Sequence, residues 1–234
     1  MRDATVVGVD GCRNAWLAVA RMPDAPLALA VFDDAASLLA HHADAAIVAV
    51  DLPLGLSDHG PRTADTLARR RLGRGRASSV FSTPLAAIVE APTRAEADRL
   101  RRAIDARGVG AQSFHLFAKI ADWRRALLAA PAREQVHEIH PEVSFAQLAG
   151  QAIAASKHTP DGARTRRALL AAHFGEAAVA ALEAALPRRR AGRDDLYDAL
   201  AALWSAERIA AGIAVSLPDP PEVDAAGLRR AIRC

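Results

Sequence analysis

The sequence predicts an α/β fold built around a mixed five-stranded sheet, and three observations favour this class. Two apolar runs, residues 4–10 and 45–51, each end in an aspartate, as expected of buried strands. Residues 16–20 and 26–32 have strand character and lie close to the first run, so three strands can form an antiparallel meander. Most of the remaining sequence has helical character, so helices should flank the sheet.

Turn and capping residues justify the connections between these strands. A turn at residues 11–14 joins the first two strands, and Asp34 begins a short helix after the third. This helix makes a crossover, so the strand at 45–51 should run parallel to the first strand. Pro53 and Gly55 then end the regular pattern.

A helical insertion of about residues 58–132 is expected after the fourth strand. Thr93 and Glu96 have the spacing of a capping box. The expected helices of the insertion are 62–72, 93–108 and 113–130. A short fifth strand at 136–139 follows and completes the sheet.

The last third of the chain is expected to be helical and to end in a loop. The expected helices are 143–149, 163–185 and 193–214. Leu196, Leu200 and Leu203 form an inward stripe on the last helix, and residues 218–222 form an acidic, proline-rich loop. Because the chain contains neither an internal repeat nor a low-complexity linker, we expect residues 1–234 to form a single domain.

The bulk composition indicates a globular protein. Of its 234 residues, 51% are hydrophobic and 24% are charged, and no apolar run is long enough to span a bilayer. The first strand begins too early for a signal sequence to precede it. With only Cys12 and Cys234, a disulfide framework is not expected. These features predict a cytoplasmic protein with no membrane partner.

Four aspartates are the candidate metal ligands, and they are Asp10, Asp51, Asp195 and Asp198. The first two end neighbouring strands, and the other two share one face of the last helix. Carboxylates that meet in this way repel one another unless protons or cations bind, and their oxygens suit Mg²⁺ or Mn²⁺. Asp10 has a structural alternative in a turn, and Asp194 and Asp195 have one as N-caps, whereas Asp51 at a buried strand end and Asp198 one turn into the helix favour a functional site.

A trio around the fifth strand offers a further acid or base. Glu138 and His140 alternate with apolar neighbours, while Glu142 lies at the start of the next helix. His140 is either a general acid or base or a structural histidine. Among the three, Glu142 is the candidate catalytic residue, as a ligand or a water-orienting base.

Positive charge is concentrated in places that suit a phosphate-bearing substrate. Arginines cluster at 69–76 and 188–193, although a solvated surface is the alternative explanation. Twenty-eight of the thirty basic residues are arginine, so the two lysines indicate positions that need a compact ammonium group. The candidate substrate-binding residues are Arg74, Arg76, Ser78, Ser79, Lys119 and Lys157.

Five ordered motifs resemble domain-of-unknown-function family 429, which is described as a family of predicted ribonuclease H-like nucleases. The motifs lie at residues 7–13, 51–56, 77–81, 138–145 and 194–199. The chain departs from the family pattern at Asn14, Ala15 and Thr63, none of which is a candidate ligand. The resemblance implies a ribonuclease H-like fold with acids at the strand ends and on the last helix.

The expected function is therefore two-metal hydrolysis of phosphodiester bonds in nucleic acid. Asp10, Asp51, Asp195 and Asp198 would hold Mg²⁺ or Mn²⁺, and Glu142 would assist. One alternative is a non-catalytic module that binds nucleic acid or protein. The other is an ATP-dependent phosphotransferase relative, for which the chain is short and lacks a glycine-rich adenosine motif.

Overall fold

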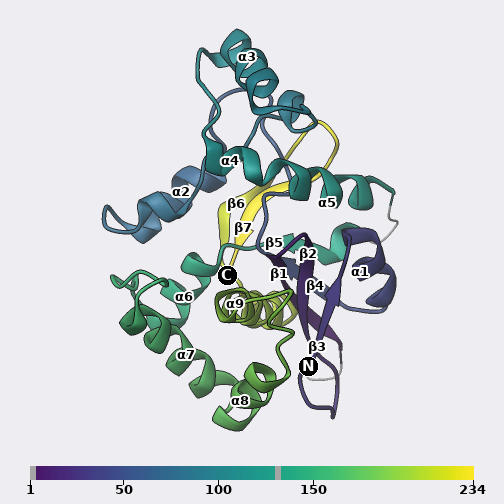
Figure 1. Ribbon diagram of the computed structural model, residues 1–234, viewed down its shortest axis with the longest axis vertical. Coiled ribbons are helices and arrows are strands. Elements are labelled where there is room, and N and C mark those ends of the chain that lie inside the picture. The colour runs from purple at the N-terminus through teal and green to yellow at the C-terminus, as the bar shows by residue number, and fades with distance from the viewer. Residues whose placement is uncertain (1–3, 130–132) are drawn as a thin grey trace.

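A mixed five-stranded sheet forms the centre of the molecule, with its strands in the order β3-β2-β1-β4-β5 (Figure 1). The computed structural model describes residues 4–129 and 133–234. The strands are β1 (Val6–Cys12), β2 (Ala15–Arg21), β3 (Ala28–Phe32), β4 (Ile47–Val50) and β5 (Val136–Glu138). The first three form an antiparallel meander, and β4 pairs in parallel with both β1 and β5. The predicted fold class is therefore confirmed.

Helices cover both faces of this sheet. The long helix α9 (Arg193–Ala210) packs on one face, together with α6 (Pro141–Ala149), α7 (Pro160–Phe174) and α8 (Glu176–Ala185). The short helix α1 (Ala35–His41) and α5 (Phe117–Ala129) pack on the other. Asp34 caps α1 by accepting a hydrogen bond from Ser37 N at 2.7 Å, as its sequence position predicts.

The backbone of α9 lies directly on β1 because Gly8 has no side chain. A Cβ atom at Gly8 would lie 2.0 Å from Leu203 N and 2.3 Å from Ala199 O, which no structure tolerates. Val7 and Val9, which point to the opposite face, are buried against α1 and α5. This close approach brings the acidic first turns of α9 over the end of β1.

The insertion after β4 extends away from the sheet as a helical lobe. It contains α2 (Thr63–Leu72), α3 (Arg94–Asp105) and α4 (Ala111–His115), with α3 at one end of the molecule (Figure 1). Thr93 caps α3, as expected, by accepting a hydrogen bond from Glu96 N. The helix expected at 113–130 is divided at Leu116 into α4 and α5. Its last residue, Ala130, and the expected end of the insertion at residue 132 lie outside the described residues.

Two expectations for the last third of the chain are wrong in detail. The helix expected at 163–185 is two helices, because α7 ends at Gly175 and α8 begins after it. The expected loop at 218–222 belongs to β6 (Ser216–Val223), which pairs with β7 (Arg229–Arg233) in a separate hairpin. Prolines are tolerated there because a two-stranded sheet consists only of edges.

Among the described residues, no single helix is long and apolar enough to cross a membrane. Helices α7 and α8 reach that length and hydropathy only when they are taken together, across a bend of 118°.

Candidate active site

Asp10 and Asp51 lie next to each other because β1 and β4 are parallel neighbours. Val9 is in register with Val50, and the pairing continues by one residue, since Asp51 N donates a hydrogen bond to Val9 O at 3.0 Å. The two aspartates that follow therefore lie side by side at the same edge of the sheet. They are close enough for the charge of Asp51 to raise the pKa of Asp10.

Helix α9 adds Asp198 to this pair. Asp198 is 2% exposed, and its charge acts on both Asp10 and Asp51. Asp195, one turn earlier, is only half-buried and accepts a hydrogen bond from Gly192 N at 2.8 Å, so it serves as a cap at the start of the helix. Asp194, the other N-cap candidate, is exposed. We call Asp10, Asp51 and Asp198 the acid cluster.

The acid cluster binds protons more tightly than ordinary aspartates do. Burial raises the pKa of Asp51 from 3.8 to about 8, and the charge of Asp198 adds to the effect. Burial, with the charges of Asp198 and Asp51, also raises the pKa of Asp10 well above its ordinary value. The pKa of Asp198 is raised to about 6, because burial outweighs the nearby lysine Lys157. At neutral pH the cluster without a metal therefore retains protons.

Both lysines of the chain lie beside the acid cluster. Lys157, in the loop between α6 and α7, forms an ion pair with Asp198. Lys119, on α5, donates hydrogen bonds to the carbonyl oxygens of Cys12 at 2.8 Å and Ala15 at 3.2 Å. A Cβ at Gly11 would lie 2.3 Å from its Nζ, so a larger residue there would displace the end of the Lys119 side chain. Lys119 therefore fixes the β1–β2 turn next to Asp10 and is not in the cavity described below.

The acid cluster has the chemistry of a site for a hard divalent cation, but not the complete geometry of one. Carboxylate oxygens are ligands that Mg²⁺ and Mn²⁺ prefer, and a cation would relieve their mutual repulsion. In the described parts of the chain, however, no three Asp, Glu, His or Cys side chains are arranged to hold a metal ion. Two contacts account for this: Lys157 pairs with Asp198, and Asp195 bonds to Gly192 N. Metal binding would therefore require Lys157 to leave Asp198.

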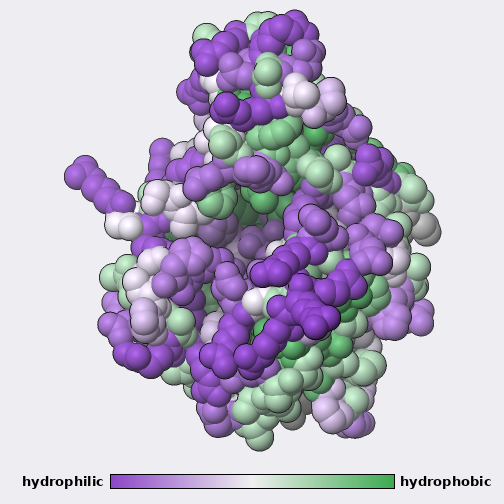
Figure 2. All heavy atoms as spheres, viewed as in Figure 1, coloured by the Kyte–Doolittle hydropathy of each residue, from purple (hydrophilic) through white to green (hydrophobic). Residues whose placement is uncertain are grey.

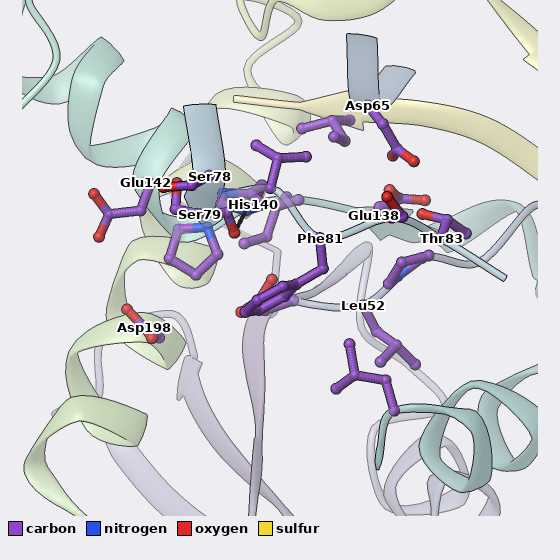
Figure 3. A pocket seen from close by; sticks show the side chains of 18 of the residues that line it. Leu52, Asp65, Ser78, Ser79, Phe81, Thr83, Glu138, His140, Glu142 and Asp198 are labelled. Atoms are coloured by element: carbon purple, nitrogen blue, oxygen red, sulfur yellow. Dashed lines mark hydrogen bonds between the residues drawn. The ribbon is translucent and has the colours of Figure 1, made fainter. Parts of the chain in front are cut away.

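A cavity of about 320 Å³ opens beside the acid cluster, and Asp51, Asp198 and Lys157 line it. Figure 2 shows that the face drawn in Figure 1 is hollowed between the lobe carrying α3 and the rest of the molecule. In Figure 3, Asp198 and Glu142 lie on one side of the cavity and Asp65 and Glu138 on the other, with Phe81 between them. The walls between these polar ends are mostly apolar, including Leu52, Ile120 and Ile139.

Glu142 lines the cavity but is not a free base. Arg166, which is buried, donates to both of its carboxylate oxygens at 3.0 and 2.6 Å, and Arg76 Nη2 lies 3.0 Å from Oε2. Although burial alone would raise it, these guanidinium groups lower the pKa of Glu142. These ion pairs do not favour the expected role as a ligand or water-orienting base, which stays a prediction. Glu142 instead holds Arg76 at the cavity wall.

The opposite end of the cavity contains a closed ion-pair network. Arg62 is 3% exposed and contacts Glu138 at 2.6 and 2.8 Å, Asp65 at 2.6 and 3.1 Å, and Gly55 O at 2.9 Å. Glu138 also accepts a hydrogen bond from Leu54 N at 3.0 Å. We call Arg62, Asp65 and Glu138 the arginine network. Since every charge in it has a partner, its role is structural.

The arginines of residues 69–76 divide into two groups. Arg69 donates to Val80 O at 2.9 Å and to Phe81 O at 3.0 Å, and Arg71 bonds to Gln147, so these two anchor the insertion. Arg74, one of the predicted substrate-binding residues, is exposed and does not line the cavity. Arg76 does line the cavity, and its buried Nε has no hydrogen-bond partner among the described residues.

Ser78, Ser79 and His140 surround Arg76 in the cavity wall. The hydroxyl of Ser79 donates to Arg76 O at 2.7 Å, and His140 Nε2 lies 3.3 Å from Ser79 O. Burial lowers the pKa of His140, so its imidazole is neutral. Ser78 is exposed at the cavity edge. These contacts shape the loop after α2, from which both Arg76 and Ser78 line the cavity.

Sequence reasoning missed the arginine network, the role of Arg166 and the position of Phe81. Arg166 could not be identified from the sequence. It is one of several arginines on its helix, and the sequence pattern does not indicate that its side chain is buried. Phe81 had a signal, since it is a large apolar residue within a polar loop and lies in one of the motifs that resemble the family, residues 77–81.

The comparisons with known proteins identify a family without an assigned activity. No curated protein and no solved structure matches the chain. The family model described as "Protein of unknown function (DUF429)" matches residues 8–223. That range includes the acid cluster, every lining residue of the cavity except Ile232, and all nine α-helices of the described residues. The chain therefore belongs to the DUF429 family.

Proposed function

We propose that the protein hydrolyses phosphodiester bonds in nucleic acid, with Mg²⁺ or Mn²⁺ held by Asp10, Asp51 and Asp198. One observation carries the proposal: three carboxylates, of which those of Asp10 and Asp198 are buried, meet at one sheet edge beside a cavity, and in the described parts of the chain their only ion pair is that of Asp198 with Lys157. Elsewhere in the same cavity, buried acids are neutralised by arginines. Burying uncompensated acids costs stability, so their retention favours a functional role.

The residues have separate roles in this proposal. Bound divalent ions would supply a Lewis acid and lower the pKa of an attacking water. Asp10 and Asp51 supply oxygen ligands from the sheet, and Asp198 supplies one from α9. Asp195 joins them only if it releases Gly192 N. Arg76 and Lys157 bind the substrate phosphate, because both are cations that line the cavity next to these acids.

The test is cleavage of a panel of labelled DNA and RNA substrates with Mg²⁺ or Mn²⁺, using the wild type and Asp51→Asn. We expect wild-type cleavage that EDTA stops and that Asp51→Asn reduces to background. Asp194→Asn is the matched control, because Asp194 is exposed on the same helix. Calorimetric titration with Mn²⁺ gives an independent readout. Wild-type protein that neither binds Mn²⁺ nor cleaves any substrate would refute the proposal.

A non-catalytic nucleic-acid-binding module is the second candidate. The ion pair between Lys157 and Asp198 favours it, because a lysine in that position supplies positive charge without a metal. The two candidates differ in one outcome: a module binds nucleic acid equally well with EDTA and leaves it intact. In either case we propose a cytoplasmic location, consistent with two buried, unpaired thiols at Cys12 and Cys234.

A further inference from the structure

Phe81 is an exposed aromatic residue on a loop that is otherwise buried or anchored. Its exposure is 47%, whereas Val80 is 5% and Thr83 is 8% exposed. Arg69 holds the carbonyl oxygens of Val80 and Phe81, and Ser113 Oγ donates to Ser82 O at 2.7 Å. The backbone is therefore fixed on both sides of Phe81, and its ring is presented to the cavity (Figure 3).

The position of Phe81 relative to the acid cluster suggests what binds there. The same cavity holds Asp51, Asp198 and Lys157 at one end, while its walls near Phe81 are apolar. A nucleotide has this distribution of chemistry, with a flat aromatic base on one side and a phosphate on the other. A volume of about 320 Å³ accommodates one such unit but not a duplex.

We propose that the cavity binds an unpaired nucleobase stacked on Phe81, so that the substrate is single-stranded or unpaired at the reacting phosphate. This inference rests on the proposed function and adds the substrate class. In a duplex the faces of a base are covered by its neighbours, so only an unpaired or flipped base can stack on a side chain. The base need not be of one kind, because every base has an aromatic face.

A second depression gives the rest of the strand a place to lie. It has a volume of about 450 Å³ and shares Lys157, His158 and Asp198 with the cavity. Its lining includes Arg193, which forms no ion pair in the described parts of the chain, whereas Arg164 is paired with Asp161 and Arg167 with Glu176 and Glu183. A strand can therefore place a base against Phe81, a phosphate at the acid cluster, and its next phosphate near Arg193. This arrangement favours an oligonucleotide over a free nucleotide.

The experiment measures binding of short labelled oligonucleotides by fluorescence anisotropy, with EDTA present so that no cleavage occurs. Single-stranded DNA and RNA are compared with a blunt duplex of the same sequence. We expect Phe81→Ala to weaken single-strand binding about tenfold, as the loss of one stacked base would do, and to leave duplex binding unchanged. Phe81→Trp should retain wild-type affinity, and Phe81→Leu should not.

The control is Leu128→Ala, because Leu128 is 51% exposed on α5 and does not line the cavity. Melting temperatures of all variants establish that they are folded. Equal weakening of single-strand and duplex binding by Phe81→Ala would overturn the inference, as would no weakening at all. Tight binding of a folded protein or peptide partner that depends on Phe81, with no binding of oligonucleotides, would also overturn it.

The outcomes separate this inference from the proposed function. Metal-dependent cleavage of a duplex by both wild type and Phe81→Ala would support the proposed function and refute the unpaired base. Binding of single strands that requires Phe81, with no cleavage under any divalent ion, would support the unpaired base and refute the hydrolase.

Discussion

The carboxylates at the two ends of the cavity have different partners. Asp51 directly follows β4 and Glu138 ends the neighbouring strand β5, and both line the same cavity. Glu138 is bound by Arg62, whereas Asp51 forms no ion pair in the described parts of the chain and lies within reach of the charges of Asp198 and Lys157. The arginine network holds the insertion onto the sheet. The acid cluster instead retains protons that a cation could replace.

This difference shows how a structural acid and a functional acid can be distinguished within one fold. Burial alone does not separate them, because Glu138 is 4% exposed and Asp10 is 7% exposed. The partner separates them: a guanidinium with fixed geometry in one case, and other carboxyl groups in the other. The predictions below test this distinction, beginning with the largest expected effect.

Removing the cation of the arginine network should destabilise the protein strongly. In Arg62→Ala, Glu138 and Asp65 would be left buried without a partner, and we expect the free energy of unfolding to fall by about 3–5 kcal/mol. Urea denaturation measures this. Combining Arg62→Met with Glu138→Gln should restore part of the loss, because no uncompensated charge then remains on Glu138. If Arg62→Ala is as stable as the wild type, the distinction between the two ends is wrong.

The acid cluster should make the free energy of unfolding fall as the pH rises. An aspartate in an ion pair has the opposite effect. The pKa of Asp51 is about 8 in the folded protein, compared with the ordinary value of 3.8 in the unfolded chain. The folded state therefore binds this proton more tightly than the unfolded state does. Stability from this group is fully present below about pH 4 and is lost as the pH rises toward 8, with a slope of at most about 1.4 kcal/mol per pH unit.

Denaturation of the metal-free protein from pH 5 to 8.5 measures this slope. Asp51→Asn should flatten it and be as stable as the wild type, or more so, at pH 8. Asp194→Asn is the control and should leave the slope unchanged, since Asp194 is exposed. A large loss of melting temperature in metal-free Asp51→Asn would assign Asp51 a structural role.

Lys157 should compete with a divalent ion for Asp198. In Lys157→Gln the carboxylate loses its partner, and we expect Mn²⁺ to bind about fivefold more tightly, equivalent to about 1 kcal/mol. Calorimetric titration measures the change. Since we also assign Lys157 to the substrate phosphate, nucleic-acid binding should weaken in the same variant. Weaker Mn²⁺ binding in Lys157→Gln would show that the lysine supports the metal site and does not compete with it.

The smallest effects are expected from single arginines at the cavity. Arg76→Gln should reduce the dependence of log K on log salt concentration for nucleic-acid binding by about 0.7–0.9 per phosphate contact. Arg69→Gln should leave that slope unchanged and lower the melting temperature instead, because Arg69 bonds to Val80 O and Phe81 O. The reverse pattern would assign substrate binding to Arg69 and anchoring to Arg76.

The sequence predicted the elements whose signals are local. Apolar runs ending in Asp10 and Asp51 identified two strands, and the positions of Asp34 and Thr93 identified two helix starts, because strand burial and capping depend on neighbouring residues. The same patterns placed the acids at strand ends and on one helical face. The two retained lysines were also noticed from composition alone, and both lie beside the acid cluster.

Only the tertiary structure decided which charges are compensated. Glu142 and Asp198 look equally available in the sequence, yet Arg166 binds the first from 24 residues away, while the second has a single lysine. The same holds for Glu138, whose partner Arg62 lies 76 residues earlier in the chain. Pairing between distant residues leaves no periodic signal, because it depends on how helices and loops pack on the sheet. The sequence therefore determined where the acids lie, and the packing decided which of them remain free for chemistry.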